Sequence, residues 1–252
     1  MGKSRLAAAL VLVAAVTAGC GAVVDGVARP APNLKPHPVI GAPVKQLPLD
    51  AAALSQLLGR PFAPVSQFPP VFGGADLLDD AYPSASPPEC TGVVYMTQKS
   101  VYRSATVANV ATELWQQEGN APTSTDVAES VVAVPTMTDA TALFAGFSDQ
   151  WKQCDGKTLT TQSSNFVDNA IADVGVADSV VSAHVLKGFG AQSILHAVPE
   201  VRALGVRGNC LVEIEVAYVG SGESSDQPPA KTDAVAVAHA VMDRISARSA
   251  GG

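Results

Sequence analysis

One amphipathic segment, from residue 138 to residue 154, constrains the fold more than any other part of the sequence. Between Thr138 and Cys154 apolar residues recur at spacings of three and four, which indicates a helix with one apolar face. Thr138 can cap this helix, and Asp139 places a negative charge in its first turn, where the helix dipole favours one. The segment is therefore predicted to be the main core helix. Its apolar stripe consists of Ala140, Leu143, Phe144, Phe147 and Trp151.

The rest of the pattern predicts a single α+β domain. Polar and apolar residues alternate most regularly from Cys210 to Val219, where Glu213 and Glu215 face away from the apolar positions. We expect this strand to have one buried and one solvated face. Mostly consecutive strands favour a central, mostly antiparallel sheet that helices cover on one side. Strands are expected at 92–98, 110–118, 127–134, 157–162, 166–174, 180–187, 201–206 and 210–219, and helices at 51–59, 138–154 and 233–248.

The N-terminus has the pattern of an exported lipoprotein. Lys3 and Arg5 precede an apolar run from Leu6 to Val16, which is too short to cross a bilayer as a helix. The run ends in Thr17-Ala18-Gly19-Cys20, which resembles the bacterial lipobox, although Thr17 stands where Leu is usual. We therefore predict a signal peptide at 1–19 and acylation of Cys20, for example with palmitate. The alternative is an ordinary secreted protein in which Cys20 has no role.

Between residues 20 and 45 the chain is rich in proline, with prolines at positions 30, 32, 36, 38 and 43. Such spacing disfavours helix and sheet and favours an extended, semi-rigid spacer. The sequence thus predicts a tether at 20–45 and a folded domain at 46–250. Lipid at Cys20 would attach this domain to the cell membrane, on the extracytoplasmic side of the cell envelope.

Three cysteines remain if Cys20 carries lipid, so one of them has no partner within the chain. Cys90 follows a stiff proline-rich loop and Cys154 ends the core helix, and a crosslink is readily accommodated at the ends of elements. Cys210 lies on the apolar face of its strand, where a free thiol acts as a small hydrophobic group. We predict a Cys90–Cys154 disulfide and a buried, unpaired Cys210. The alternatives are a bridged Cys210 and a reactive one.

Charge and motifs argue against several function classes. The formal net charge is −7 and no Lys/Arg cluster is present, so a nucleic-acid partner is not expected. The sequence contains no nucleophile elbow, zinc-binding, phosphate-binding or dinucleotide-binding motif. We therefore predict no catalytic residue, no metal and no cofactor, and no enzyme activity. A hydrolase remains the weakest hypothesis, and it would need His184 or His196 within hydrogen-bond reach of a serine and an acid.

Several motifs carry a resemblance to a known family. These are Pro87-Pro88-Glu89-Cys90, Tyr102, the FSDQWKQCDGKTLT run at 147–160 and the RALGVRGN run at 202–209. With them, the chain resembles the extracellular sensor domain of PknH-type mycobacterial Ser/Thr kinases, which also occurs alone in mycobacterial lipoproteins. The likeness covers about residues 47 to 248. It implies a compact α+β domain with a central sheet, held by disulfides, for which an extracytoplasmic ligand is presumed.

The sequence departs from this family at one point. The family usually has a second cysteine pair that flanks the RALGVRGN run, and the corresponding positions here are Val201 and Tyr218. The second bridge is therefore expected to be absent, together with any cleft geometry that it fixes. No kinase catalytic domain accompanies the sensor-like segment, so a signal would have to pass through another protein.

These observations lead to two main hypotheses. The first is a lipid-anchored extracytoplasmic sensor-like domain that binds an unidentified small ligand or an envelope partner. The second is an interaction or structural lipoprotein of the envelope that has no small ligand. A pocket with a few polar groups favours the first hypothesis, and a flat exposed apolar patch favours the second.

Overall fold

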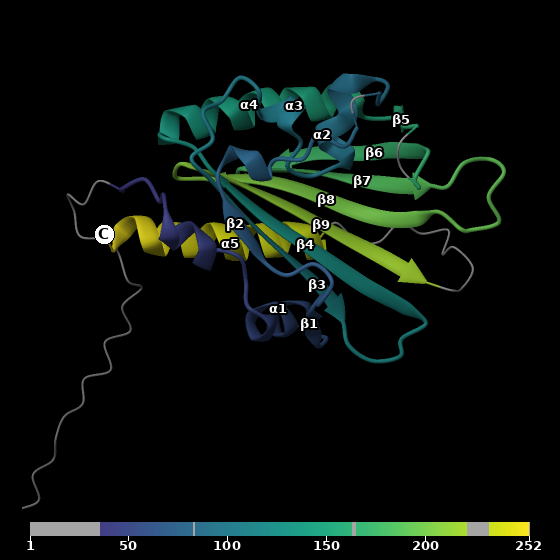
Figure 1. Ribbon diagram of the computed structural model, residues 1–252, viewed down its shortest axis with the longest axis horizontal. Helices are drawn as coiled ribbons and strands as arrows, with labels where there is room; N and C mark the ends of the chain where they lie inside the picture. The colour runs from purple at the N-terminus through teal and green to yellow at the C-terminus, as the bar shows by residue number, and fades with distance from the viewer. Residues whose placement is uncertain (1–35, 83, 163–164, 221–231, 252) are drawn as a thin grey trace, which may run out of the picture. The chain divides into compact units, whose positions relative to one another are not determined.

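The structure is a computed structural model, and it describes residues 36–82, 84–162, 165–220 and 232–251 (Figure 1). The predicted signal peptide, Cys20 and the first part of the proline-rich tether lie outside the described residues. Within them, nine strands form one sheet in the order β1-β3-β4-β9-β8-β7-β6-β5, and β2 also pairs with β3. All of these strand pairs are antiparallel, which confirms the predicted α+β fold with a central sheet.

The elements follow a simple order along the chain. The strands are β1 Phe62–Pro64, β2 Val71–Gly73, β3 Asn109–Gln117, β4 Thr123–Ala133, β5 Thr158–Thr160, β6 Asp168–Ala177, β7 Val180–Gly188, β8 Val198–Arg207 and β9 Cys210–Gly220. The α-helices are α1 Ala51–Leu58, α2 Thr91–Val94, α3 Lys99–Tyr102, α4 Met137–Cys154 and α5 Thr232–Ala250.

Helices cover both faces of the sheet, whereas the sequence predicted cover on one face. Apolar residues of α5 pack into one core with β4, β8 and β9, and α4 and α2 pack into a second core on the other face (Figure 1). We call these the α5 face and the α4 face. The expected solvated face of β9 is consequently wrong, because Glu213 is only 2 % exposed on the α4 face. Alternation reports which residues share a face, and it does not report what covers that face.

The core helix α4 spans nearly the predicted residues. Its cap is Thr136, not Thr138, because the Thr136 hydroxyl accepts a hydrogen bond from the Asp139 N–H at 3.1 Å. Phe147 and Trp151 are buried, and Phe144 is only partly buried at the edge of the core. The helix ends at the predicted disulfide, which joins Cys154 to Cys90.

The chain after Cys90 differs from the prediction. The sequence predicted a strand at 92–98, but a 3₁₀ helix at Pro88–Cys90 leads into α2, and α3 follows after a turn. Val93 and Val94 are fully buried against α4 because the disulfide holds this segment there. A short apolar run is compatible with a buried strand or a buried helix, so periodicity does not distinguish the two.

Two turns between β6 and β9 contain residues with positive φ, a conformation that most side chains disfavour. The β8–β9 turn lies at Gly208-Asn209, between the strands expected at 201–206 and 210–219, and Gly208 has a φ of 56° that favours glycine. The β6–β7 turn lies at Asp178 and Ser179, which also have positive φ. The strand expected at 166–174 therefore ends too early, because β6 continues through residues 175–177 after a shift of register between Ala172 and Gly175.

Residues 36–50 form a strap that is docked on the domain, although the sequence assigned residues up to 45 to a free tether. The strap buries Val39, Val44, Leu47 and Leu49. Asn209, which is fully buried, accepts a hydrogen bond from the Val39 N–H at 2.7 Å and donates one to the Val39 carbonyl at 3.0 Å. The folded domain therefore begins near residue 36, and both hydrophobic cores lie within the described residues.

Candidate functional site

The α4 face carries five charged side chains on three neighbouring strands, and we call them the charged cluster. Strand register brings them together, because Arg202 lies opposite Glu215 and Lys187 lies two residues beyond the partner of Glu200. Since alternate residues of a strand share a face, these positions lie side by side. The cluster consists of Lys187 on β7, Glu200 and Arg202 on β8, and Glu213 and Glu215 on β9.

Arg202 is the centre of the cluster and is completely buried. Its Nη2 lies 3.3 Å from an oxygen of Glu213, and its Nη1 lies 3.6 Å from Glu215. Its Nε donates to the Val93 carbonyl of α2 at 3.1 Å, so the short helix α2 supplies part of the site. The guanidinium also lies 6.0 Å from the centre of the Trp151 ring. The predicted core helix thus supports the cluster from above the sheet.

Glu213 is held by two further donors. The Tyr102 hydroxyl donates to it at 2.7 Å, and the Thr97 N–H donates to it at 3.1 Å. Burial raises the pKa of Glu213, and the Arg202 charge opposes this shift. The Tyr102 ring packs edge-on against Phe147, with 5.3 Å between the ring centres. Three separate segments therefore position this carboxylate.

Lys187 occupies a cage of two carboxylates and two aromatic rings. Its Nζ lies 2.8 Å from Glu200 and 3.3 Å from Glu215, and it lies 5.2 Å and 5.6 Å from the ring centres of Tyr95 and Phe166. Burial alone would lower the pKa of Lys187, but the two carboxylates outweigh this effect and raise it. Burial and the neighbouring Glu215 charge raise the pKa of Glu200. The ammonium group is thus held charged inside the protein.

Beyond the charged cluster, the α4 face is open over the outer parts of β3 and β4 and the end of β9, and we call this area the floor. In Figure 1, α4 lies alongside β6 and β7, away from β3 and β4. Glu215 belongs to the charged cluster but also borders the floor. Its side chain is 22 % exposed, whereas that of Arg202 is fully buried. Floor residues are partly or largely exposed, with the exception of Ala217 at 9 %. The floor consists of Leu114, Gln116, Ser124, Asp126, Ala128, Ala217 and Val219.

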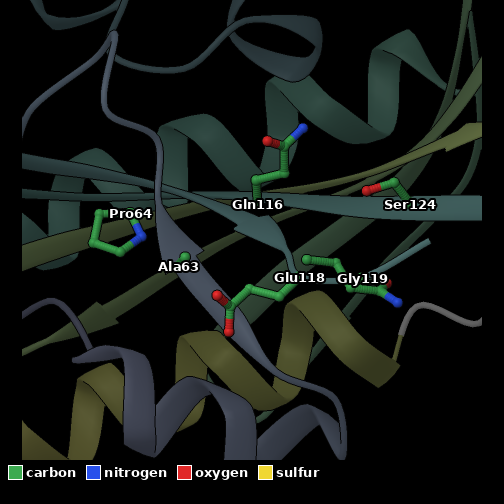
Figure 2. A pocket seen from close by; sticks show the side chains of 7 residues that line it. Ala63, Pro64, Gln116, Glu118, Gly119 and Ser124 are labelled. Atoms are coloured by element: carbon green, nitrogen blue, oxygen red, sulfur yellow. The ribbon is translucent and has the colours of Figure 1, made fainter. Parts of the chain in front are cut away.

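A polar cavity of about 410 Å³ lies at the outer edge of the floor. Figure 2 shows Gln116 and Ser124 on the sheet and Ala63 and Pro64 on the neighbouring strand β1. Strand register continues from Gln116 through Asp126 and Ala217 to Glu200, so the cavity and the charged cluster lie on one face. The full lining is Ala63, Pro64, Gln116, Gln117, Glu118, Gly119 and Ser124.

Asp126 lies between the cavity and the charged cluster. One of its carboxylate oxygens, Oδ1, is buried and has no hydrogen-bond partner within the described residues. Burial raises the pKa of this carboxyl group. A buried acceptor without a donor is uncommon in folded proteins and calls for a physical explanation.

The remaining residues singled out in the sequence lie elsewhere. Cys210 is buried and free on the α5 face, and burial raises the pKa of its thiol to about 12, which makes it a poor nucleophile. His184 lies on β7 with its Nδ1 2.9 Å from Asp173, and His196 lies exposed in the loop after β7. Neither histidine belongs to the charged cluster or to the cavity lining.

Sequence reasoning missed Lys187, Glu200 and Arg202 as site residues. A signal was present, because Glu200 and Arg202 are charged residues at alternate positions of a strand that is otherwise mostly apolar. Among the described residues, no group of three or more His, Cys, Asp and Glu side chains is arranged to hold a metal ion. In the same part of the chain, no helix is long and apolar enough to cross a membrane.

The fold places the chain in a class of bacterial extracellular domains. A family model described as the PknH-like extracellular domain matches residues 39–244, so the chain belongs to this family. The crystal structure of the extracellular domain of PknH from Mycobacterium tuberculosis has the same fold, with a TM-score of 0.64 and 22 % sequence identity. The match covers 84 % of this chain and 98 % of that structure.

Two curated relatives agree with this assignment. The serine/threonine-protein kinases PknH of Mycobacterium bovis and Mycobacterium tuberculosis are each 30 % identical to this chain over 159 residues. The aligned part is 61 % of this chain, and it is 24 % of the first kinase and 23 % of the second. The chain therefore spans about a quarter of the length of these relatives.

Proposed function

We propose that this chain is an extracytoplasmic sensor-like domain that binds a small ligand on the floor of the α4 face. The ligand is one that carries several hydrogen-bond donors, such as amine, amide or hydroxyl groups. The observation that carries the proposal is the unsatisfied, buried oxygen of Asp126, which lies between a polar cavity and the charged cluster. Glu215 and Gln116 offer further polar groups on either side of it.

The energetics of the charged cluster support a functional interpretation. Buried ion pairs contribute little net stability, because desolvation of the charges offsets most of their attraction. Apolar residues of similar size would commonly serve the fold as well. A cluster on three strands, with Glu215 partly open to the floor, is thus better explained by recognition of a polar ligand. Arg202 and Lys187 would hold Glu215 in a fixed orientation for that purpose.

We also propose that Cys20 carries the lipid that anchors this domain to the outer side of the cell membrane. The support is the charged N-terminal segment, the apolar run and the small residues before Cys20, all of which lie outside the described residues. Because the strap is docked from residue 36, the free spacer would be residues 21–35. Membership of an extracellular domain family agrees with this location.

Native mass spectrometry of the protein purified from its own host tests ligand binding. We expect a co-purifying small molecule, and we expect the double variant Asp126→Asn/Glu215→Gln to lose it at least tenfold. Glu113→Gln is the matched control, because Glu113 is a half-buried carboxyl on the α5 face of the same sheet. Equal retention of the molecule by both variants would contradict the proposed site. The absence of any such molecule would favour an interaction protein without a small ligand.

A further inference from the structure

The loop between β7 and β8, residues 189–197, presents an apolar tip to solvent. Ile194 is 95 % exposed and Leu195 is 60 % exposed, so Ile194 has the highest exposure among the exposed large hydrophobic residues of the described chain. Single exposed apolar residues are common on protein surfaces, but two adjacent ones on a protruding loop mark a contact site. This loop belongs to neither the floor nor the charged cluster.

The tip is built on an ordered base. The Gly190 carbonyl accepts a hydrogen bond from the Ser193 N–H at 3.0 Å, and the Ser193 hydroxyl accepts one from the Leu195 N–H at 3.0 Å. Below this turn, the Phe189 ring packs against Phe166, with 4.8 Å between the ring centres. The fold thus holds the two aliphatic residues outward, and they are not covered by the domain itself.

The chemistry of the loop fits a lipid surface. Residues 188–199 contain no Asp, Glu, Lys or Arg, although the chain as a whole carries a formal charge of −7. A protein partner is usually recognised through a mixture of apolar and charged groups, whereas entry into the acyl region of a bilayer excludes charge. A loop without Asp, Glu, Lys or Arg and with an Ile-Leu tip therefore matches a bilayer better than an acidic or basic protein surface.

The position of the loop allows the predicted anchor and the tip to reach the same bilayer. The strap begins beside the C-terminal end of α5, where the His37 N–H donates to the Ser249 carbonyl, and the β7–β8 loop lies at the other end of the sheet (Figure 1). The ten residues of β8 span about 33 Å between these ends. A spacer of residues 21–35 reaches about 47 Å when extended at about 3.1 Å per residue, which exceeds that span.

We propose that the tip of the β7–β8 loop, Ile194 and Leu195, inserts into the bilayer to which Cys20 anchors the chain. The domain would then lie along the membrane with contacts at both ends of the sheet, which leaves it little freedom to rotate on its spacer. This inference rests on the proposed anchor and is independent of the proposed ligand. The inference predicts that the end of the sheet next to the strap and the end that carries the β7–β8 loop both face the membrane.

Depth measurement with a single fluorescent label tests the proposal. The lipidated full chain with Ile194→Cys is labelled with an environment-sensitive fluorophore and reconstituted in phosphatidylcholine vesicles. We expect lipid-borne spin labels to quench this fluorophore at least threefold more strongly than one at Ala145→Cys, which is exposed on α4. The native cysteines do not interfere, because Cys90 and Cys154 are bonded and Cys210 is buried. Equal, weak quenching at both positions would overturn the proposal.

A second measurement separates the loop from the anchor. The unlipidated chain from Gly21 onward contains the complete described domain, and its binding to phosphatidylcholine vesicles can be followed by sedimentation. Ile194→Ser/Leu195→Ser should weaken this binding about tenfold, since each buried aliphatic side chain contributes to transfer into lipid. A different result would be shielding of the fluorophore at Ile194→Cys from water without vesicles, to a degree that rises with protein concentration. That result would show that a second copy of the chain covers the tip, and it would overturn the proposal. Unchanged detergent partition of Cys20→Ala would refute the anchor, and with it the attachment of the domain at both ends, whereas the proposed ligand site would be unaffected.

Discussion

The two faces of the sheet are built from the same strands, but they bury different chemistry. On the α5 face, the inward residues of β4, β8 and β9 are mostly aliphatic, and the carboxyl group of Glu129 is a buried exception. On the α4 face, the alternate residues of β7 to β9 include the five members of the charged cluster. α5 attaches to the sheet mainly through apolar side chains, and its polar contacts, such as Tyr218 with Asp233, lie at its edges. This difference in buried chemistry indicates that the α5 face contributes mainly to stability. The α4 face is less stabilising, because it buries charged groups that form a polar site.

Glu129 shows how one isolated carboxyl group is accommodated in an apolar core. Its Oε2 accepts a hydrogen bond from the Leu49 N–H of the strap at 3.0 Å, and its Oε1 is buried without a partner within the described residues. Burial raises its pKa to about 8, so it is mainly protonated at neutral pH. The guanidinium of Arg202, by contrast, lies beside two carboxylates, those of Glu213 and Glu215. The buried carboxyl group on the α5 face is thus accommodated in its neutral form, whereas the buried groups on the α4 face form ion pairs.

Arg202→Met should have the largest effect on stability. It leaves Glu213 buried without its cation and removes a donor to the Val93 carbonyl, so we expect a loss of about 3–5 kcal/mol in the free energy of unfolding. Arg207→Met on the same strand is exposed and should change it by less than about 0.5 kcal/mol. Denaturant unfolding measures both. A similarly small effect of Arg202→Met would show that the α4 face tolerates unpaired charge, and the contrast between the faces would fail.

Glu129→Gln should stabilise the protein at pH 7.5 by about 1–3 kcal/mol. The pKa of Glu129 is raised from its value in the unfolded chain to about 8 in the folded protein, so its contribution to stability is greatest below about pH 4.5 and is lost as the pH rises toward 8. Glutamine keeps an acceptor for the Leu49 N–H and does not ionise. Unfolding free energies at pH 5 and pH 7.5 show how steeply stability changes with pH in the variant and in the natural protein.

Glu113→Gln is the control for this pH dependence. Glu113 lies opposite Glu129 on β3, but it is only half-buried, so its substitution should change the slope much less. Equal slopes for the natural protein and Glu129→Gln would mean that water or a cation already compensates the carboxylate. The α5 face would then resemble the α4 face more than its packing suggests.

Glu215→Gln should have the smallest effect, below about 1 kcal/mol. Its side chain is 22 % exposed, and Arg202 and Lys187 each keep another carboxylate partner when it is neutralised. Thermal unfolding of the purified variant checks this expectation. A loss as large as that of Arg202→Met would identify Glu215 as a structural residue and would remove it from the proposed ligand site.

Much of the fold could be predicted from local pattern. The spacing of Phe147, Trp151 and Cys154 located the core helix and its disulfide, because a regular amphipathic stripe is a strong signal over a long segment. The same reasoning was wrong at residues 92–98, where the disulfide and the packing of Val93 decide the local structure. The strap was missed for a related reason. Prolines indicate an extended chain, but they do not show whether that chain is free or docked.

The candidate site was less accessible to sequence reasoning. The alternation of β9 placed Glu213 and Glu215 on one face, but it did not reveal that Tyr102 and Arg202 would cover Glu213 there. Those partners come from positions remote in the chain, and strand register alone brings Arg202 beside Glu215. The cavity near Gln116 likewise depends on the pairing of β1 with β3. Such sites arise from tertiary contacts that no local window contains.

The docked strap gives the domain a defined response to mechanical load. A pull on the chain before residue 36 would reach the Val39–Asn209 hydrogen bonds before it reached any strand of the sheet. Asn209 also donates to the carbonyl of Val134, just before the start of α4, at 2.7 Å. Detachment of the strap would therefore remove two hydrogen bonds from Asn209, both to Val39, and weaken its support of the segment just before α4. Tension on the tether would thus be transmitted through Asn209 to the segment that leads into the helix covering the charged cluster.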